Sequence, residues 1–431
     1  MEKDVPGWLK LDNSARIYPM IYNQNGQNIF RVSCELTERV DPVILRNALK
    51  DILPKYPSFN VKLKRGVFWY YFEENRKPPI IFNEADIAAD KIDFKANNDY
   101  IFRASYYNST VSLDFDHSVT DGKGGFEFVK ALLFRYFVLQ GHDIDGANLV
   151  RPFDSPPDKG EMEDSFSVNY KPVRIRDVRL NEILGRRGYE ISGVPFENSK
   201  YGLITGQCDI SAIKLAAKKY NATVTEYLGG LLMYSIYKTN YNDHSGKRPI
   251  KLLIPINLRR LFGSRTLRNF SFASVVEAEI KSKDITLEYF IGEIKKQLTK
   301  TLEEANLRTA VAGIVKVDKN FLVKLLPLPV KYVIFRLIQE FIWKFKTNTA
   351  IFTNPGIIDI PRTMHPFIRQ LNFFSAPVRS LKLNCATVTH NGEISISFAR
   401  RCKETDIMKF FFNALTKEGA EIGVVSNYAE L

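Results

Sequence analysis

Residues 111–141 (VSLDFDHSVTDGKGGFEFVKALLFRYFVLQG) constrain the fold of this chain more than any other stretch. Residues 111–116 alternate apolar and polar side chains up to His117, which is the pattern of a β-strand. Residues 118–125 contain one aspartate and three glycines, and we expect a tight loop there. From Phe126 onward apolar residues recur every three or four positions, which predicts a helix that ends at Gly141. A histidine at the end of a strand is held in place by a rigid element, and the loop beside it can form one wall of a cleft.

His117, Asp121 and Gly122 form the pattern H-x-x-x-D-G. The chemical interpretation is a histidine base that points into a cleft, with Asp121 fixing the loop that aims it. Gly122 would permit a turn that a Cβ atom would block. The alternative is an ordinary histidine beside an Asp-Gly turn. Because the pattern falls at a strand–loop–helix junction, we favour the catalytic interpretation.

The H-x-x-x-D-G pattern after a hydrophobic strand resembles the chloramphenicol-acetyltransferase-like superfamily of acyltransferases. This superfamily includes the condensation domains of peptide synthetases, wax-ester synthases and alcohol acetyltransferases. Many members carry two consecutive histidines, whereas Asp116 precedes His117 here. Asp116 could act on the imidazole through its charge or simply face solvent, and the sequence leaves both open.

A second segment supports the resemblance. Residues 255–259 (PINLR) and 266–270 (TLRNF) resemble elements from the second half of these acyltransferases, in which an arginine pairs with the motif aspartate and holds the loop. The resemblance implies that Arg259 is the partner of Asp121, and a bidentate pair would fix the geometry well. The alternative is that Arg259 and Arg260 are surface cations. Asn269 is a candidate substrate ligand, including a donor to an oxyanion.

Residues 349–360 (TAIFTNPGIIDI) predict a strand that ends in a turn. The turn resembles one that lines the substrate channel in this superfamily, so Thr353 and Asn354 are candidate donors to substrate; plain turn chemistry is the alternative. Together with the V-D-P start of the first helix and the N-L-R element, it makes the bacterial alcohol-acetyltransferase-like branch the best match.

The resemblance covers nearly the whole chain and implies an α/β (α+β) fold. Two chloramphenicol-acetyltransferase-like subdomains would form a V, with the active-site channel at their interface. A length of 431 residues fits two domains. We expect the N-terminal subdomain with the motif at residues 1–178, a crossover linker at 179–200 and the C-terminal subdomain at 201–431. Residues 147–200 favour a crossover because they are rich in Pro, Asp, Arg and Gly with little periodicity.

Other elements follow from simple patterns. Alternation predicts strands at 28–35, 201–208, 251–256 and 272–280, and a late hairpin that turns at Asn391 and Gly392. Asp41 before Pro42 predicts one helix start, and Thr223 or Thr225 with Glu226 predicts another. Residues 288–306 predict a charged amphipathic helix on the outside.

Residues 321–345 (FLVKLLPLPVKYVIFRLIQEFIWKF) place bulky apolar residues around four cations. One interpretation is a basic amphipathic helix pair that makes peripheral contact with a membrane or roofs a tunnel for an acyl chain. The other is two core helices broken at Pro327 and Pro329, and we favour it because apolar stripes at helical spacing usually lie in the core.

Composition narrows the choice of partners. The formal net charge of +13 suits coenzyme A phosphates, an acidic carrier protein or an anionic membrane, but the cations are scattered, which disfavours nucleic acid. Four cysteines without C-x-x-C spacing predict reduced thiols and no metal site. With no apolar signal core and no run of 18 apolar residues, we expect a cytoplasmic protein without a membrane span.

The resemblance implies an acyltransferase that moves an acyl group from a thioester, acyl-CoA or an acyl carrier protein, to a small alcohol, an amine or a lipid. Neutral His117 would act as general base without a covalent intermediate, so we expect no permanently bound cofactor, acyl-CoA as co-substrate, and a monomer. The alternative is a catalytically degenerate condensation-like domain that binds an acyl carrier or lipid without turnover. A hydrolase is disfavoured because no G-x-S-x-G motif is present.

Overall fold

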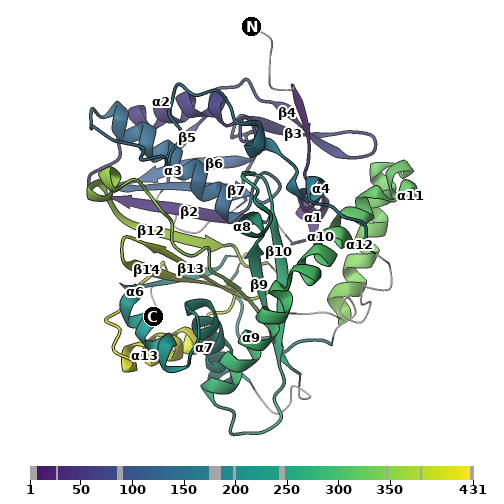
Figure 1. Cartoon of the computed structure of the whole chain (residues 1–431), viewed down its shortest axis with the longest axis vertical. Helices are drawn as coiled ribbons and strands as arrows, with labels where there is room; N and C mark the ends of the chain where they lie inside the picture. The colour runs from purple at the N-terminus through teal and green to yellow at the C-terminus, as the bar shows by residue number, and fades with distance from the viewer. Residues whose placement is uncertain are drawn as a thin grey trace.

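The computed structural model describes residues 7–25, 28–84, 91–173, 186–197, 200–241, 248–345, 348–378 and 381–427. Its architecture is mixed α/β, with two large sheets that lie one above the other, each with helices packed against it (Figure 1). Residues 179–185 and 198–199 of the predicted linker lie outside the described residues. The subdomain boundaries at 178 and 200 therefore stay a prediction.

The upper sheet carries the motif. Across the sheet its strands are β12 (Ile368–Ser375), β2 (Ile29–Leu36), β7 (Thr110–Asp116), β6 (Phe102–Tyr107) and β5 (Ile81–Asn83). Helices α2 (Pro42–Ile52) and α3 (Gly122–Leu139) lie together above it (Figure 1). Asp41 caps α2 by accepting hydrogen bonds from the backbone of Val43 and Ile44, at 2.8 and 3.0 Å, which confirms the predicted helix start.

The lower sheet has seven strands. In order they are β10 (Ser271–Ala278), β9 (Ile250–Asn257), β11 (Ala350–Thr353), β13 (Leu383–His390), β14 (Glu393–Arg400), β8 (Gly202–Asp209) and β15 (Gly423–Ser426). One core joins this sheet to α6 (Ile210–Lys219), α7 (Val224–Thr239), α9 (Leu287–Leu302) and α13 (Asp406–Lys417). The capping box of Thr223 and Glu226 at the start of α7 confirms the predicted cap. α9 is the predicted amphipathic helix, with one apolar face buried and charged residues such as Glu288 and Lys296 exposed, and it ends at Leu302.

Strands β9 and β10 reach from the lower half toward the upper one (Figure 1). Residues 258–270, between these strands, include α8 (Arg259–Phe262) and contact the motif loop. We call residues 258–270 the arm loop. It is supported by α4 (Ser165–Val168) and α10 (Glu304–Lys319), whose Phe166, Leu307 and Val311 pack around Phe270 of the arm loop.

The chain crosses between the two sheets more than once. Strand β12 comes from the second half of the sequence but pairs antiparallel with β2 in the upper sheet. The sequence analysis predicted no strand there. A register shift between Ile368 and Gln370 marks a bulge, and a bulge interrupts the alternation by which a strand is recognised in sequence.

Smaller elements border the upper sheet. β1 (Trp8–Lys10), β4 (Tyr70–Glu74) and β3 (Val61–Arg65) form a three-stranded sheet, and α1 (Tyr18–Asn25) follows β1. α11 (Phe321–Leu325) and α12 (Leu328–Phe345) lie at the margin of the molecule (Figure 1). The interpretation as core helices is wrong for residues 321–338 as far as their side chains are described, because apolar residues of both helices are exposed, Phe321 and Leu337 by more than half.

The start of α3 also differs from the prediction. The helix begins at Gly122 rather than Phe126, because Asp121 caps it by accepting a hydrogen bond from the backbone of Gly124 at 3.2 Å. Gly122 does not have a positive φ, so the prediction of a turn that requires glycine at this position is wrong. The tight contact lies at Gly124, where a Cβ atom would come within 2.0 Å of the Leu267 carbonyl oxygen in the arm loop.

We expect Gly124→Ala to lower the free energy of unfolding by about 1–3 kcal/mol, because the clash with backbone outweighs the gain in helix propensity. Gly292 of α9 is the control, since a Cβ atom there meets nothing within 4 Å. Gly292→Ala should raise stability by roughly 0.5–1 kcal/mol. Urea unfolding measures both, and an equal gain in the two variants would contradict the close contact at Gly124.

Candidate active site

His117 follows the last residue of β7, and its imidazole is partly exposed. The ring stacks on Tyr18, with centroids 4.7 Å apart and planes at 20°. The ring of Phe30 meets it edge to face at 5.4 Å. Aromatic contacts on two sides fix the plane of the imidazole.

Asn269 of the arm loop determines which imidazole nitrogen carries the proton. His117 Nδ1 lies 2.9 Å from Asn269 Oδ1. The amide nitrogen of Asn269 donates to the His117 carbonyl oxygen at 3.0 Å and to Asp12 Oδ2 at 3.2 Å, so its oxygen must face the ring. Because an amide oxygen only accepts, Nδ1 of the neutral imidazole is the donor and Nε2 keeps the lone pair.

This geometry changes the role of Asn269. Both of its amide protons are engaged inside the protein and its side chain is buried, so the expectation that Asn269 binds substrate or an oxyanion is not supported. Asp12 is buried as well, and burial raises its pKa although Arg268 lies close. The sequence analysis missed Asp12 and Tyr18, because nothing in the spacing of the N-terminal segment marks them.

Asp121 and Arg259 form a buried bidentate ion pair. Arg259 Nη1 lies 2.9 Å from Asp121 Oδ2, and Nη2 lies 2.8 Å from Oδ1. Arg259 also donates to the carbonyl oxygens of Thr266 and Arg268, at 2.7 and 2.6 Å. With 7% exposure Arg259 is no surface cation, whereas Arg260 is exposed.

The surroundings of Asp121 favour its charged form. Burial alone would raise the pKa of this carboxyl, but the charge and hydrogen bonds of Arg259, with the backbone N–H groups of Phe270 and Gly124, lower it below its ordinary value. The carboxylate is therefore directed at the arm loop, and no hydrogen bond joins it to His117 among those found in the described residues.

Asp116 does not face solvent, so that possibility is wrong. Its side chain is fully buried, and its Oδ1 accepts hydrogen bonds from the Tyr22 hydroxyl at 2.7 Å and from the backbone and hydroxyl of Ser118. Oδ2 has no hydrogen-bond partner within the described ranges. Burial raises the pKa of the Asp116 carboxyl, against the effect of these hydrogen bonds.

Among the contacts found in the described residues, none joins Thr353 or Asn354 to His117. Thr353 ends β11, and the Asn354 amide donates to the Thr225 hydroxyl at 3.0 Å. Asn354 Oδ1 accepts a hydrogen bond from the backbone of Gly356 at 2.9 Å. The Asn354–Gly356 contact is turn chemistry, whereas the contact with Thr225 joins the turn to the first turn of α7. A role of Thr353 and Asn354 in substrate binding stays a prediction.

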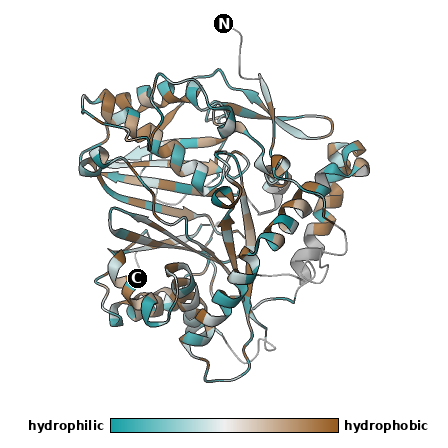
Figure 2. Ribbon diagram, in the orientation of Figure 1, coloured by the Kyte–Doolittle hydropathy of each residue, from teal (hydrophilic) through white to brown (hydrophobic). Residues whose placement is uncertain are grey.

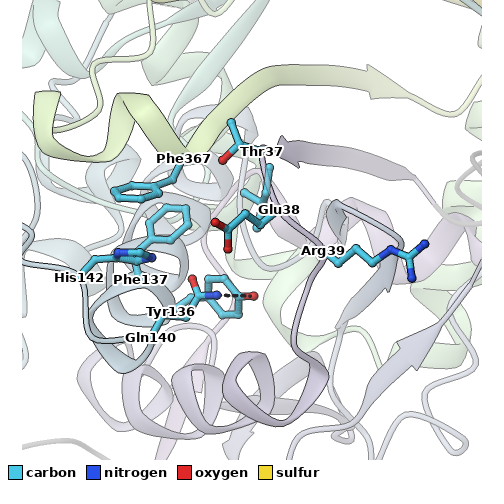
Figure 3. Close-up of a pocket in the computed structure, with 9 residues that line it drawn as sticks. Thr37, Glu38, Arg39, Tyr136, Phe137, Gln140, His142 and Phe367 are labelled. Atoms are coloured by element: carbon cyan, nitrogen blue, oxygen red, sulfur yellow. Dashed lines mark hydrogen bonds between the residues drawn. The ribbon is translucent and has the colours of Figure 1, made fainter.

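The hollow drawn in Figure 3 is a separate feature. Tyr136, Phe137, His142 and Phe367 line it together with residues of segment 36–39. It lies at the end of the 18-residue helix α3 that is opposite to Asp121, so it is about 25 Å from the motif loop. Within the parts of the chain that the structure describes, no three His, Cys, Asp or Glu side chains are grouped to hold a metal ion.

Solved structures share the fold over almost their full length. Polyketide synthase associated protein 5 from Mycobacterium tuberculosis is 13% identical, with a TM-score of 0.61 over 96% of this chain and 99% of the other. Trichothecene 15-O-acetyltransferase from Fusarium sporotrichioides is 12% identical, with a TM-score of 0.63 over 95% and 94%. The starter condensation domain of rhizomide synthetase, in complex with C8-CoA, is 8% identical, with a TM-score of 0.60 over 95% and 93%.

These similarities show that the chain shares the fold of these structures, which include an acetyltransferase and a condensation domain, as predicted. Among curated proteins no sequence matches this chain. The sequence model of alcohol acetyltransferases matches residues 186–415, which is more than half of the 431 residues. The chain therefore belongs to the alcohol acetyltransferase family of acyltransferases.

Proposed function

We propose that this protein transfers an acyl group from a thioester to a hydroxyl or amine acceptor, with His117 as the general base. The observation that carries the proposal is the 2.9 Å contact between His117 Nδ1 and Asn269 Oδ1. It leaves the unprotonated Nε2 as the nitrogen that can accept a proton from the acceptor.

The reaction needs no covalent acyl-enzyme. Nε2 of His117 takes the proton of the acceptor hydroxyl as its oxygen attacks the thioester carbonyl carbon. The tetrahedral oxyanion then collapses, the carbon–sulfur bond breaks, and the departing thiolate takes the proton from the imidazolium. In the cationic intermediate Nδ1 still donates to Asn269 Oδ1, so the ring keeps its orientation throughout.

Asp121, Gly122 and Arg259 have a supporting role in this proposal. The ion pair joins the first turn of α3 to the arm loop, and the arm loop carries Asn269. Gly122 lies beside Phe373, whose ring a Cβ atom would meet at 3.2 Å. These residues position the base and the loop but do not exchange protons with the substrate.

Acyl-CoA is the donor that we propose first. The net charge of +13 suits the phosphates of coenzyme A, and a structural relative binds C8-CoA. A carrier-bound thioester presents the same reacting group. The four cysteines are free and buried, which suits a reducing compartment such as the cytoplasm.

The test measures thiol release from acyl-CoA esters, acetyl to palmitoyl, with pooled alcohols and amines. His117→Ala should lower acceptor-dependent release by about 10²–10⁴-fold, because the general base is lost. His142→Ala, in the hollow of Figure 3, is the control and should keep the rate. Unchanged turnover in His117→Ala would exclude His117 as the base. If wild-type protein released no thiol from acyl-CoA or from carrier-bound thioesters, the alternative of a domain that binds an acyl carrier or lipid without turnover would be favoured.

A second prediction concerns Asn269 as a positioning residue. Asn269→Ala should lower kcat by roughly tenfold or more with little change in KM, because the required tautomer is no longer enforced. Nitrogen-15 NMR of histidine-labelled protein separates this role from a merely structural one. In neutral wild-type His117 the proton should sit on Nδ1, and in Asn269→Ala a substantial share should move to Nε2. An unchanged tautomer in the variant would refute the assignment.

A third prediction concerns the buried ion pair. Asp121→Asn leaves Arg259 unpaired and should lower the free energy of unfolding at pH 7 by about 3–5 kcal/mol. Because the pKa of Asp121 is lowered in the folded state, its stabilising effect is present above its ordinary pKa of 3.8 and is lost as the pH falls through the folded value. The difference in the free energy of unfolding between wild type and Asp121→Asn, measured by urea unfolding, should therefore become smaller below pH 3.8. Asp154→Asn, at an exposed carboxylate, should show no such pattern.

A further inference from the structure

Helix α12 turns its apolar side outward. Val330, Val333, Ile334, Leu337 and Ile338 occupy positions i, i+3, i+4, i+7 and i+8, so they share one face of the helix. Each of them is between 41% and 61% exposed. An amphipathic helix on a water-facing surface has the opposite orientation, with its apolar stripe toward the core.

The inward side of α12 is held by a lysine. Lys331 is 6% exposed, and its ammonium group donates to the Phe68 carbonyl oxygen at 2.9 Å and lies 3.5 Å from the centre of the Trp69 ring. The backbone of Leu328 donates to the Val67 carbonyl oxygen at 2.8 Å. These contacts hold the helix against the hairpin between β3 and β4. The orientation of its exposed face is therefore determined by tertiary contacts.

Neighbouring residues extend the apolar face. The hairpin tip exposes Val67 by 70% and Phe68 by 44%, and α11 exposes Phe321 by 70% and Leu325 by 55%. We call these four residues and the five of α12 the apolar patch. In Figure 2 the part of α12 next to α11 has hydrophobic colours although it lies at the margin of the molecule. Apolar surfaces of this extent mark contact sites.

The charge beside the patch selects its partner. Residues 321–345 contain three lysines and one arginine against a single glutamate. Exposed cations lie close in sequence to residues of the patch, at Lys324 and Arg336 in the helices and at Lys64 and Arg65 in β3, where Lys64 Nζ lies 3.9 Å from Glu73 Oε2. A second copy of the chain would bring the same cations together, and the net charge of +13 adds to that repulsion. Anionic phospholipid headgroups complement both the cations and the apolar side chains.

We propose that the apolar patch docks the protein onto the surface of an anionic phospholipid bilayer. The patch enters the boundary between headgroups and acyl chains, α12 lies along the surface, and the flanking cations contact lipid phosphates. The contact is peripheral, since no helix in the described part of the chain is long and apolar enough to cross a bilayer. The proposal does not depend on the acyltransferase activity.

The test is co-sedimentation of the full chain with vesicles of phosphatidylcholine alone and of phosphatidylcholine mixed with phosphatidylglycerol. Binding to the anionic vesicles should be stronger and should weaken with added salt. The affinity of the variant Val333→Ser/Leu337→Ser for the anionic vesicles should fall by roughly tenfold or more, because two inserted apolar side chains are lost. Leu215→Ser/Val425→Ser, at equally exposed apolar residues of α6 and β15, is the matched control and should bind like wild type.

Three outcomes would overturn the proposal. In the first, wild-type protein binds neither kind of vesicle. In the second, Val333→Ser/Leu337→Ser binds the anionic vesicles as strongly as wild-type protein and the control variant do. In the third, size-exclusion chromatography with light scattering would show a wild-type dimer that becomes a monomer only in Val333→Ser/Leu337→Ser, without vesicle binding. The patch would then be an interface between two copies.

Discussion

The buried ion pair of Asp121 and Arg259 holds the candidate site together. It joins two segments that are 138 positions apart in the sequence, the first turn of α3 and the arm loop. A buried pair of this kind contributes less to net stability than to a unique geometry, because desolvation offsets much of the attraction. Here the geometry is what the site requires. The arm loop also carries Asn269, and an error of an ångström there would release Nδ1 of His117.

The site is thus assembled from three parts of the chain. β7 delivers His117, the arm loop delivers Asn269 and Arg259, and the N-terminal segment delivers Asp12 and Tyr18. Gly124 allows the arm loop to approach, since its missing Cβ atom leaves room for the Leu267 carbonyl oxygen. Each part depends on the others, so the orientation of a single imidazole depends on the packing of both halves.

Helix α12 has an unusual orientation on the surface of the molecule. On α12 a lysine lies inside and the apolar stripe lies outside, which is the reverse of the usual orientation of an amphipathic helix on a protein surface. Periodicity shows that a helix is amphipathic, but both of its faces have the same spacing. Only the neighbours decide which face turns inward. Here Trp69 and the Phe68 carbonyl oxygen offer Lys331 a cation–π contact and a hydrogen bond.

The sequence by itself determined the local elements and the chemistry of the motif. Alternation located β2 and β7, side-chain caps located α2 and α7, and H-x-x-x-D-G singled out His117 and Asp121. These features depend on residues close together in the chain, whose spacing can be read directly. Tertiary structure alone decided the membership of β12 in the upper sheet, the buried state of Asp116, the tautomer-fixing contact of Asn269 and the outward face of α12. Each of these arises from contacts between distant segments, and such contacts leave no periodic trace in the sequence.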